Sequence, residues 1–302
     1  MQSFSLSENQ KLNNTIVTVG KFDGIHKGHE KLLEILTSKA NGRQKVVLTF
    51  SSAPTAFLEK KSNKTIMTEQ EKRLLMEEQG VDVYIRMPLT EEFLSLSPEE
   101  FVRDILKETL GATTIVCGTD FRFGAKAKGD VELLKALQKK YDFNVVVVEK
   151  EQYNQKDISS SEIRDLISRG EMRTVNMLLD HPYRIIGKVT EGKQLGRTMK
   201  IPTANIIPDE NKLLPPNGVY RTVVVVGDEA YHAITNVGIN PTVESGTQIK
   251  VETHIIDFKE YIYHETIEVQ FYDFIRPEKE FDSLKELQKQ IQKDIESCKK
   301  LR

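Results

Sequence analysis

Continuously apolar runs alternate with amphipathic runs through the first 180 residues of the chain. The apolar runs are short and rich in β-branched residues, and they cover 15–20, 45–50, 81–87, 113–118 and 144–150. Apolar character at successive positions, rather than at every second one, predicts strands that are buried on both faces of a parallel sheet. With helical periodicity between the runs, the first part of the chain is predicted to be an α/β domain.

Two of the predicted helices have clear start signals. Thr68 is followed three residues later by Glu71, which is the spacing of a capping box. Ser97 and Glu100 repeat that spacing with a proline between them, and this helix is expected to stop at Gly111. These signals predict helices over 68–80 and 97–111.

The pattern changes after residue 182. Strand-like segments punctuated by Gly, Asn, Pro and Asp follow one another with almost no helix between them, at 183–192, 218–228, 231–238, 249–257 and 266–275. This spacing predicts a small antiparallel barrel or sandwich. One helix closes the chain, and we expect it to pack on the barrel through an apolar stripe made of Phe281, Leu284, Leu287, Ile291, Ile295 and Cys298. We therefore predict two domains, 1–181 and 182–302.

Composition narrows the possible partners. The formal net charge of the 302 residues is -2 without a long basic run, so nucleic acid is not an expected partner. No apolar stretch reaches the roughly 18 residues of a membrane span, and the polar N-terminus has no signal-peptide character. Cys117 and Cys298 show no metal-ligand spacing. We expect a cytoplasmic protein, monomeric or weakly homo-oligomeric, with no membrane partner.

The segment 18–33, TVGKFDGIHKGHEKLL, carries the first candidate chemistry. It lies where the first strand is expected to give way to a helix, which is a usual phosphate position in a parallel sheet. His26 and His29 flank the predicted helix start, where the helix dipole favours an anion. Either histidine alone would be read as a loop or capping residue. The pair at this position favours hydrogen-bond donors to a phosphate.

This segment resembles the H-x-G-H signature of the nucleotidylyltransferase superfamily, whose members transfer a nucleotidyl group from a nucleoside triphosphate and release pyrophosphate. Residues 157–172, DISSSEIRDLISRGEM, resemble its late I-S-S-T-x-I-R motif, in which serines and an arginine contact the triphosphate. The resemblance implies that His26 and His29 are catalytic. It implies ATP contacts from Gly20, Phe22, Asp23, Gly28, Ser159, Ser160, Ser161 and Arg164.

A third motif narrows the family. VCGTDFRFGAKAKGD, 116–130, resembles the G-x-D-F-x-F-G segment of the bacterial riboflavin kinase/FAD synthetase family. Read without the family, it is a strand-end loop with packed phenylalanines. The resemblance implies that Asp120 and Arg122 bind the flavin nucleotide.

The second half carries P-T-A-N at 202–205. In an extended segment Thr203 and Asn205 face one side, where a hydroxyl and an amide oxygen suit magnesium and a nucleotide phosphate. A turn with local hydrogen bonds is the alternative for the bare motif. The stretches 217–220, 236–242 and 251–254 match the flavokinase module of the same family, in the same order.

The flavokinase resemblance implies that Thr203 and Asn205 bind Mg²⁺-ATP and that Glu252 is the general base for the 5′-hydroxyl of riboflavin. Asn236 and Arg276 are weaker candidates for the flavin. The implied fold is a Rossmann-like nucleotidylyltransferase domain followed by a six-stranded Greek-key flavokinase barrel and a terminal helix.

The implied function is synthesis of flavin nucleotides. The C-terminal domain would phosphorylate riboflavin to FMN with ATP, and the N-terminal domain would adenylylate FMN to FAD. Ser51, Ser52 and Ala53 depart from the family's usual residues near the adenylylation site, and Lys200 departs before P-T-A-N. Two alternatives therefore stay open: a kinase with a degenerate nucleotide-binding N-terminal domain, and a non-catalytic flavin-binding regulator.

Overall fold

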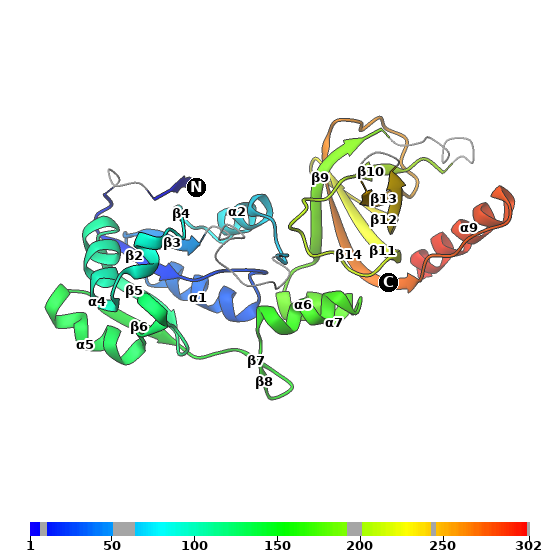
Figure 1. Cartoon of the computed structure of the whole chain (residues 1–302). Helices are drawn as coiled ribbons and strands as arrows, with labels where there is room; N and C mark the ends of the chain where they lie inside the picture. Colours follow the sequence, from blue (N-terminus) through cyan, green and yellow to red (C-terminus); the bar gives the residue numbers. More distant parts are fainter. Residues whose placement is uncertain (7–10, 51–63, 192–200, 243–245, 301–302) are drawn as a thin grey trace. The chain divides into compact units, whose positions relative to one another are not determined.

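The β-branched runs of the first half form a parallel sheet in the computed structural model, which describes residues 1–6, 11–50, 64–191, 201–242 and 246–300. The chain divides into two units, Met1–Ser160 and Ser161–Arg302. The predicted domain boundary after residue 181 stays a prediction. Each unit is described by itself (Figure 1).

The first unit is built on a six-stranded sheet in the order β1-β4-β3-β2-β5-β6, with all neighbouring strands parallel. The strands are β1 (Gln2–Ser5), β2 (Thr15–Val19), β3 (Gln44–Phe50), β4 (Val83–Met87), β5 (Ala112–Gly118) and β6 (Asn144–Val148). β2 is fully buried, as its continuous apolar run predicts. The first strand of the α/β repeat therefore lies in the middle of the sheet, between β3 and β5, and the chain reverses its direction of winding there.

Helices connect these strands. They are α1 (Lys27–Ser38), α2 (Glu69–Glu78), α3 (Glu91–Ser95), α4 (Pro98–Glu100), the π-helix η1 (Phe101–Thr109), the 3₁₀-helix η2 (Ala125–Ala127) and α5 (Val131–Tyr141). A small hairpin, β7 (Gln152–Tyr153) and β8 (Lys156–Asp157), precedes α6 (Ser160–Ser168). Both predicted capping boxes are present, at Thr68–Glu71 and Ser97–Glu100.

Three predictions need correction. The helix over 97–111 is α-helical only at its start and continues as the π-helix η1. The N-terminal residues were not predicted to pair, yet β1 joins the sheet beside β4. The terminal apolar stripe is not wholly covered, because Leu284 is 57% exposed.

The second unit is a closed antiparallel barrel in the strand order β10-β13-β12-β11-β14-β9. Its elements are α7 (Met172–Leu179), β9 (Tyr183–Thr190), β10 (Ala204–Ile206), β11 (Gly218–Val226), β12 (Glu229–Thr242), β13 (Gly246–Ile255), β14 (Thr266–Arg276) and α9 (Leu284–Lys300). The predicted six-stranded barrel with a terminal helix is confirmed. The patterning had suggested five strands, and the short β10 is the sixth.

The terminal helix packs on the barrel through its C-terminal half. Ile295 and Cys298 of α9 are buried in one cluster with Val219 and Ile234 of the barrel. Ile291 contacts the same cluster. The helix thus covers an outer part of the barrel next to β12, which places it beside the second candidate site.

Two candidate active sites

The loop between β2 and α1 holds the first site, and its backbone is unusual. Phe22, Gly24 and Ile25 all have positive φ values, of 47°, 96° and 44°. A β-branched residue such as Ile25 rarely adopts this conformation, so the surroundings must hold it there. The side chains of Phe22 and Ile25 are fully buried. Packing of these two side chains in the core therefore anchors the loop.

Hydrogen bonds fix the same loop from its sides. The Oδ1 atom of Asp23 accepts from the backbone N–H groups of Ile66 at 2.9 Å and Met67 at 3.2 Å. The carbonyl oxygen of Asp23 accepts from the Ser160 hydroxyl at 2.8 Å. Asp23, which the resemblance assigns to ATP, thus holds the loop in place before any ligand arrives.

The two histidines lie against each other at the start of α1. Their ring centroids are 3.8 Å apart and the rings are nearly parallel, at 23°. The Phe22 ring supports His29 from 5.0 Å. A Cβ atom at Gly28 would come within 3.3 Å of the His26 ring, so the glycine of H-x-G-H leaves room for it.

Both imidazoles are held neutral. Burial lowers the pKa of His26 to about 4, although the nearby carboxylates of Asp23 and Asp120 oppose the shift. Burial also lowers the pKa of His29 well below 6.5, and repulsion by the protonated form of His26 and by Lys72 adds to this effect. The Nδ1 atoms of both rings are buried without a hydrogen-bond partner among the described residues. Buried polar atoms of this kind are costly unless a ligand satisfies them.

The predicted flavin ligands of this half follow β5. Asp120 and Arg122 are exposed. Lys150 pairs with Asp120, with 3.1 Å between Nζ and Oδ2, and Arg122 lies 3.7 Å from Asp130. Asp120 acts electrostatically on His26, so the end of β5 lies near the histidine pair, at the carboxyl ends of the strands.

The serine run crosses the division between the two units. Ser159 and Ser160 belong to the first unit, whereas Ser161 and Arg164 belong to the second. The Ser160 hydroxyl donates to the Asp23 carbonyl oxygen of the histidine loop. The triphosphate contacts expected of Ser159, Ser161 and Arg164, and those of Gly20, stay predictions. For Gly20 the structure gives a packing reason, since a Cβ would lie 3.0 Å from the Phe22 ring.

The second site is assembled by strand register. Asn205 on β10, Glu252 on β13 and Asn236 on β12 are direct partners across the three neighbouring strands. Directly opposite residues in antiparallel strands share a face. The barrel thus gathers three of the predicted kinase residues, which are up to 47 residues apart in the sequence, into one row.

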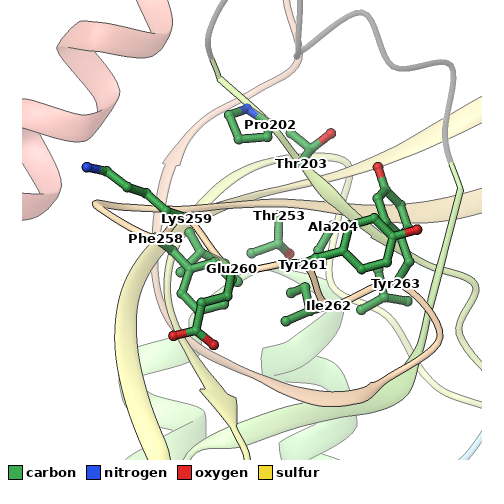
Figure 2. Close-up of a pocket in the computed structure, with 12 residues that line it drawn as sticks. Pro202, Thr203, Ala204, Thr253, Phe258, Lys259, Glu260, Tyr261, Ile262 and Tyr263 are labelled. Atoms are coloured by element: carbon green, nitrogen blue, oxygen red, sulfur yellow. The ribbon is translucent and has the colours of Figure 1, made fainter.

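Two cavities meet at Thr203. One, of about 350 Å³, lies between residues 202–204 and the loop 258–263, and its lining includes Thr253, Tyr261 and Tyr263 (Figure 2). The other, of about 370 Å³, lies between the barrel and α9 and is lined by Glu252, Asn236 and Arg276 among others. Thr203 lines both. A group held at Thr203 can therefore be reached from either cavity.

The P-T-A-N segment ends in the strand β10, which begins at Ala204, and a neighbouring side chain holds its start. His254 alternates with Glu252 along β13, as predicted, and both line the cavity beside α9. The Nδ1 atom of His254 donates to the Pro202 carbonyl oxygen at 2.9 Å. Asn205 is 5% exposed, and its Oδ1 atom has no hydrogen-bond partner among the described residues. A buried amide oxygen and a threonine hydroxyl two residues apart in the chain are both oxygen ligands of the kind that Mg²⁺ prefers.

Arg276, a predicted flavin ligand, forms an ion pair with a carboxylate of α9. It lines the cavity beside α9, but its Nε and Nη2 atoms donate to Asp294 of α9 at 3.0 and 2.9 Å. Gln290 also donates to Asp294, at 2.8 Å. This partly buried pair ties α9 to the end of β14. A direct contact of Arg276 with the flavin stays a prediction.

Sequence reasoning missed Asp294, the aromatic loop 258–263 and Lys72. Asp294 lies on the predicted terminal helix, and its i, i+4 spacing from Gln290 was the available signal. The loop DFKEYIY stands out by its three aromatic residues between two strands. Lys72 gave no signal, because lysine in a charged helix is normally solvated.

The departures from the family lie outside the described residues. They are Ser51, Ser52, Ala53 and Lys200.

Comparison with known proteins decides the family. A profile described as FAD synthetase matches residues 8–162, and one described as riboflavin kinase matches residues 179–302. The chain belongs to the bifunctional riboflavin kinase/FAD synthetase family. The predicted family is confirmed, and its two modules stand in the predicted order. This pairing favours a bifunctional enzyme over a kinase with a degenerate domain or a non-catalytic regulator.

Individual relatives agree over almost the whole chain. The "Bifunctional riboflavin kinase/FMN adenylyltransferase" of Buchnera aphidicola subsp. Schizaphis graminum is 37% identical, covering 96% of this chain and 95% of its own. The protein of the same name from Listeria monocytogenes is 34% identical, covering 93% and 90%. A crystal structure titled as a macrolide-efflux protein from Streptococcus pneumoniae superposes with a TM-score of 0.89 at 30% identity, with both chains covered fully. Its title names an activity that neither family profile nor these curated relatives name.

The remaining predictions are tested only in part. No helix within the described ranges has the length and apolar character to cross a bilayer. Cys117 and Cys298 are both free and buried. The cytoplasmic location, the oligomeric state and the absence of nucleic acid as a partner stay predictions.

Proposed function

We propose that the second unit phosphorylates riboflavin, with the flavin in the cavity beside α9 and ATP in the cavity beside the loop 258–263. The observation that carries this proposal is the position of Thr203 on the common wall of the two cavities. A phosphoryl group has to pass from one substrate to the other along a short, straight path. Two cavities joined at one side chain provide such a path.

Glu252 is the general base in this proposal. It lines the flavin cavity, in register between Asn205 and Asn236. Its carboxylate takes the proton from the 5′-hydroxyl as the hydroxyl oxygen bonds to the γ-phosphorus of ATP. The bond between the γ-phosphorus and the bridging oxygen breaks, and its electron pair leaves with ADP. FMN and ADP are the products.

The oxygen atoms of Thr203 and Asn205 would hold Mg²⁺. The fit rests on the buried Asn205 Oδ1, which lacks a partner among the described residues. No cluster of three His, Cys, Asp or Glu side chains suited to a metal occurs in the described ranges, so phosphate oxygens would complete the shell. When bound, the ion supplies neutralisation of phosphate charge. His254 positions the segment through the Pro202 carbonyl.

We also infer that the first unit joins FMN to AMP from a second ATP. A phosphate oxygen of FMN bonds to the α-phosphorus, the bond to the β-phosphate bridging oxygen breaks, and pyrophosphate leaves. His26 and His29 are neutral donors to the α-phosphate, since burial keeps both pKa values low. FMN approaches from the β5 side, past Asp120.

Chromatography of the flavins tests both proposals. The purified full chain is incubated with riboflavin, ATP and Mg²⁺, and then separately with FMN, ATP and Mg²⁺. We expect FMN and FAD from the first mixture and FAD from the second. FMN alone would contradict the role of the first unit, and unchanged riboflavin would contradict that of the second. Loss of product with a chelator and its return with Mg²⁺ tests the metal.

A further inference from the structure

Lys72 on α2 is a buried cation that the proposed chemistry has not used. It is 7% exposed. Its Nζ atom donates to the Lys21 carbonyl oxygen at 3.2 Å and lies 4.0 Å from the Glu69 carboxylate. An ammonium group has three N–H donors, and this one makes a single hydrogen bond among the described residues. Burial lowers the pKa of Lys72, and the carboxylates of Glu69 and Asp23 oppose this shift. Burying an ammonium group with one hydrogen bond is costly, and a bound anion would offset that cost.

The surroundings of Nζ lie at the ligand-binding edge of the sheet. Lys21 comes directly after β2, and its carbonyl oxygen also accepts from the hydroxyl of Thr49, near the end of β3. Ligands of parallel sheets sit beyond these carboxyl ends. The charge of Lys72 also lowers the pKa of His29, so the ammonium and the imidazole are electrostatic neighbours.

The histidine pair has one side towards β5 and one side towards β3, and the attacking and leaving groups of the reaction would occupy opposite sides. The carboxylate of Asp120, which follows β5, acts electrostatically on His26, whereas Lys72 lies towards β3. In phosphoryl and nucleotidyl transfer the attacking and leaving oxygens are roughly in line. If FMN enters from β5 and the α-phosphate rests on the imidazoles, the leaving group departs towards β3.

We propose that Lys72 binds the β- and γ-phosphates of ATP and neutralises the charge that develops on the departing pyrophosphate. This inference rests on the proposed adenylyl transfer. As the bond from the α-phosphorus to its bridging oxygen breaks, the electron pair moves onto pyrophosphate beside the ammonium. The same group would hold pyrophosphate before its release.

The test compares two inhibitors of FAD formation from supplied FMN, namely pyrophosphate and AMP. Lys72→Met should raise the inhibition constant of pyrophosphate by about tenfold or more, as expected for a lost charge-assisted hydrogen bond. The inhibition constant of AMP, which lacks the β- and γ-phosphates, should stay unchanged. Lys72→Arg should restore part of the pyrophosphate effect, because it keeps the charge. Arg73→Met, at the exposed neighbouring position on α2, is the matched control.

The possible outcomes distinguish a Lys72 that binds phosphate from one that has only a structural role. Equal weakening of AMP and pyrophosphate would show that Lys72 only clamps the Lys21 carbonyl, and unchanged inhibition would also overturn the proposal. Wild-type chain that makes no FAD would instead contradict the proposed function itself. If Lys72→Met unfolds in a thermal scan, Lys72→Arg carries the comparison: the proposal requires pyrophosphate inhibition to change more than AMP inhibition there as well.

Discussion

The two sites of this chain are built in opposite ways. In the first unit the seven-residue loop 20–26 leads into the start of α1, where His29 lies, and its backbone adopts positive φ at Phe22, Gly24 and Ile25. In the second unit, regular antiparallel strands bring Asn205, Glu252 and Asn236 together by register. One site depends on a strained loop held by its surroundings, and the other on a closed barrel.

This difference determines which substitutions should impair each site. The histidine loop depends on hydrogen bonds within the protein, such as those of the Asp23 carboxylate and the Ser160 hydroxyl. The barrel row depends on ladder hydrogen bonds that single substitutions barely disturb. Changes around the loop should therefore impair FAD formation through positioning, whereas changes in the row should act on the phosphoryl transfer itself.

The largest expected effect is at Glu252. Glu252→Gln removes the general base and should lower FMN formation by about 10²–10⁴-fold. FAD formation from supplied FMN should be unchanged, and both rates are measured by chromatography of the flavins. Glu229→Gln, on the same barrel but outside both cavities, is the control. Loss of both activities in Glu252→Gln would mean that the sites are not independent.

The second-largest effect is expected at His29, and it concerns the other activity. His29→Ala should lower FAD formation from FMN by about 10²–10³-fold, the usual loss for a donor at a developing charge. FMN formation from riboflavin should stay at the wild-type rate in the same assay. Lys31→Ala, which removes an exposed side chain from the same helix, should change neither rate.

Acid should destabilise the chain through His26. Its pKa is about 4 in the folded protein and about 6.5 when unfolded, so the unfolded chain binds more protons between these values. Stability is therefore fully present above pH 6.5 and falls as the pH drops towards 4, by up to about 3 kcal/mol. Urea unfolding followed by circular dichroism should show this fall, and His26→Asn should reduce it. An equal fall in the variant would exclude His26 as its source.

The tie between the terminal helix and the barrel should control flavin affinity. Asp294→Asn leaves the Arg276 guanidinium without its charged partner and should loosen α9 beside the flavin cavity. A loss of about 1.4 kcal/mol corresponds to about a tenfold rise in KM for riboflavin. Glu296→Gln, exposed on the same helix, is the control. An unchanged KM would show that α9 does not form part of the flavin site.

The smallest effect is expected at Ser160. Ser160→Ala removes one neutral hydrogen bond to the histidine loop, worth about 0.5–1.5 kcal/mol. FAD formation should fall by about 2–10-fold while FMN formation is unchanged. Ser168→Ala on the same helix, where the hydroxyl bonds only within the helix, should have no effect.

Much of the fold could be predicted because local and global signals agree. β2 is a continuous apolar run and is fully buried, and Thr68 caps α2 as its spacing indicates. β10 could not be found by periodicity, since three residues are too few to show alternation. The capping box at Ser97–Glu100 predicts where a helix begins, but it carries no signal for the π-helical form that follows in η1.

The site was predictable to the extent that its residues belong to contiguous motifs. His26, His29, Thr203 and Glu252 all stand in short signatures. Lys72 and Asp294 do not, because each is defined by a partner distant in sequence: the Lys21 carbonyl and the Arg276 guanidinium. Their burial follows from tertiary packing, which no local pattern of charge reveals.

The closure of the barrel has a consequence for solubility. A closed barrel has no free first or last strand, because β10 joins β9 to β13, although it pairs with only three residues of β13. The described strands of the barrel are therefore less open to pairing with another chain than the edges of an open sheet are. The open sheet of the other half has two such edges. One is β1, only four residues long, which suits an edge that must not recruit a neighbour. The other is the valine-rich β6, which makes it the edge of this sheet that is more open to intermolecular β-pairing.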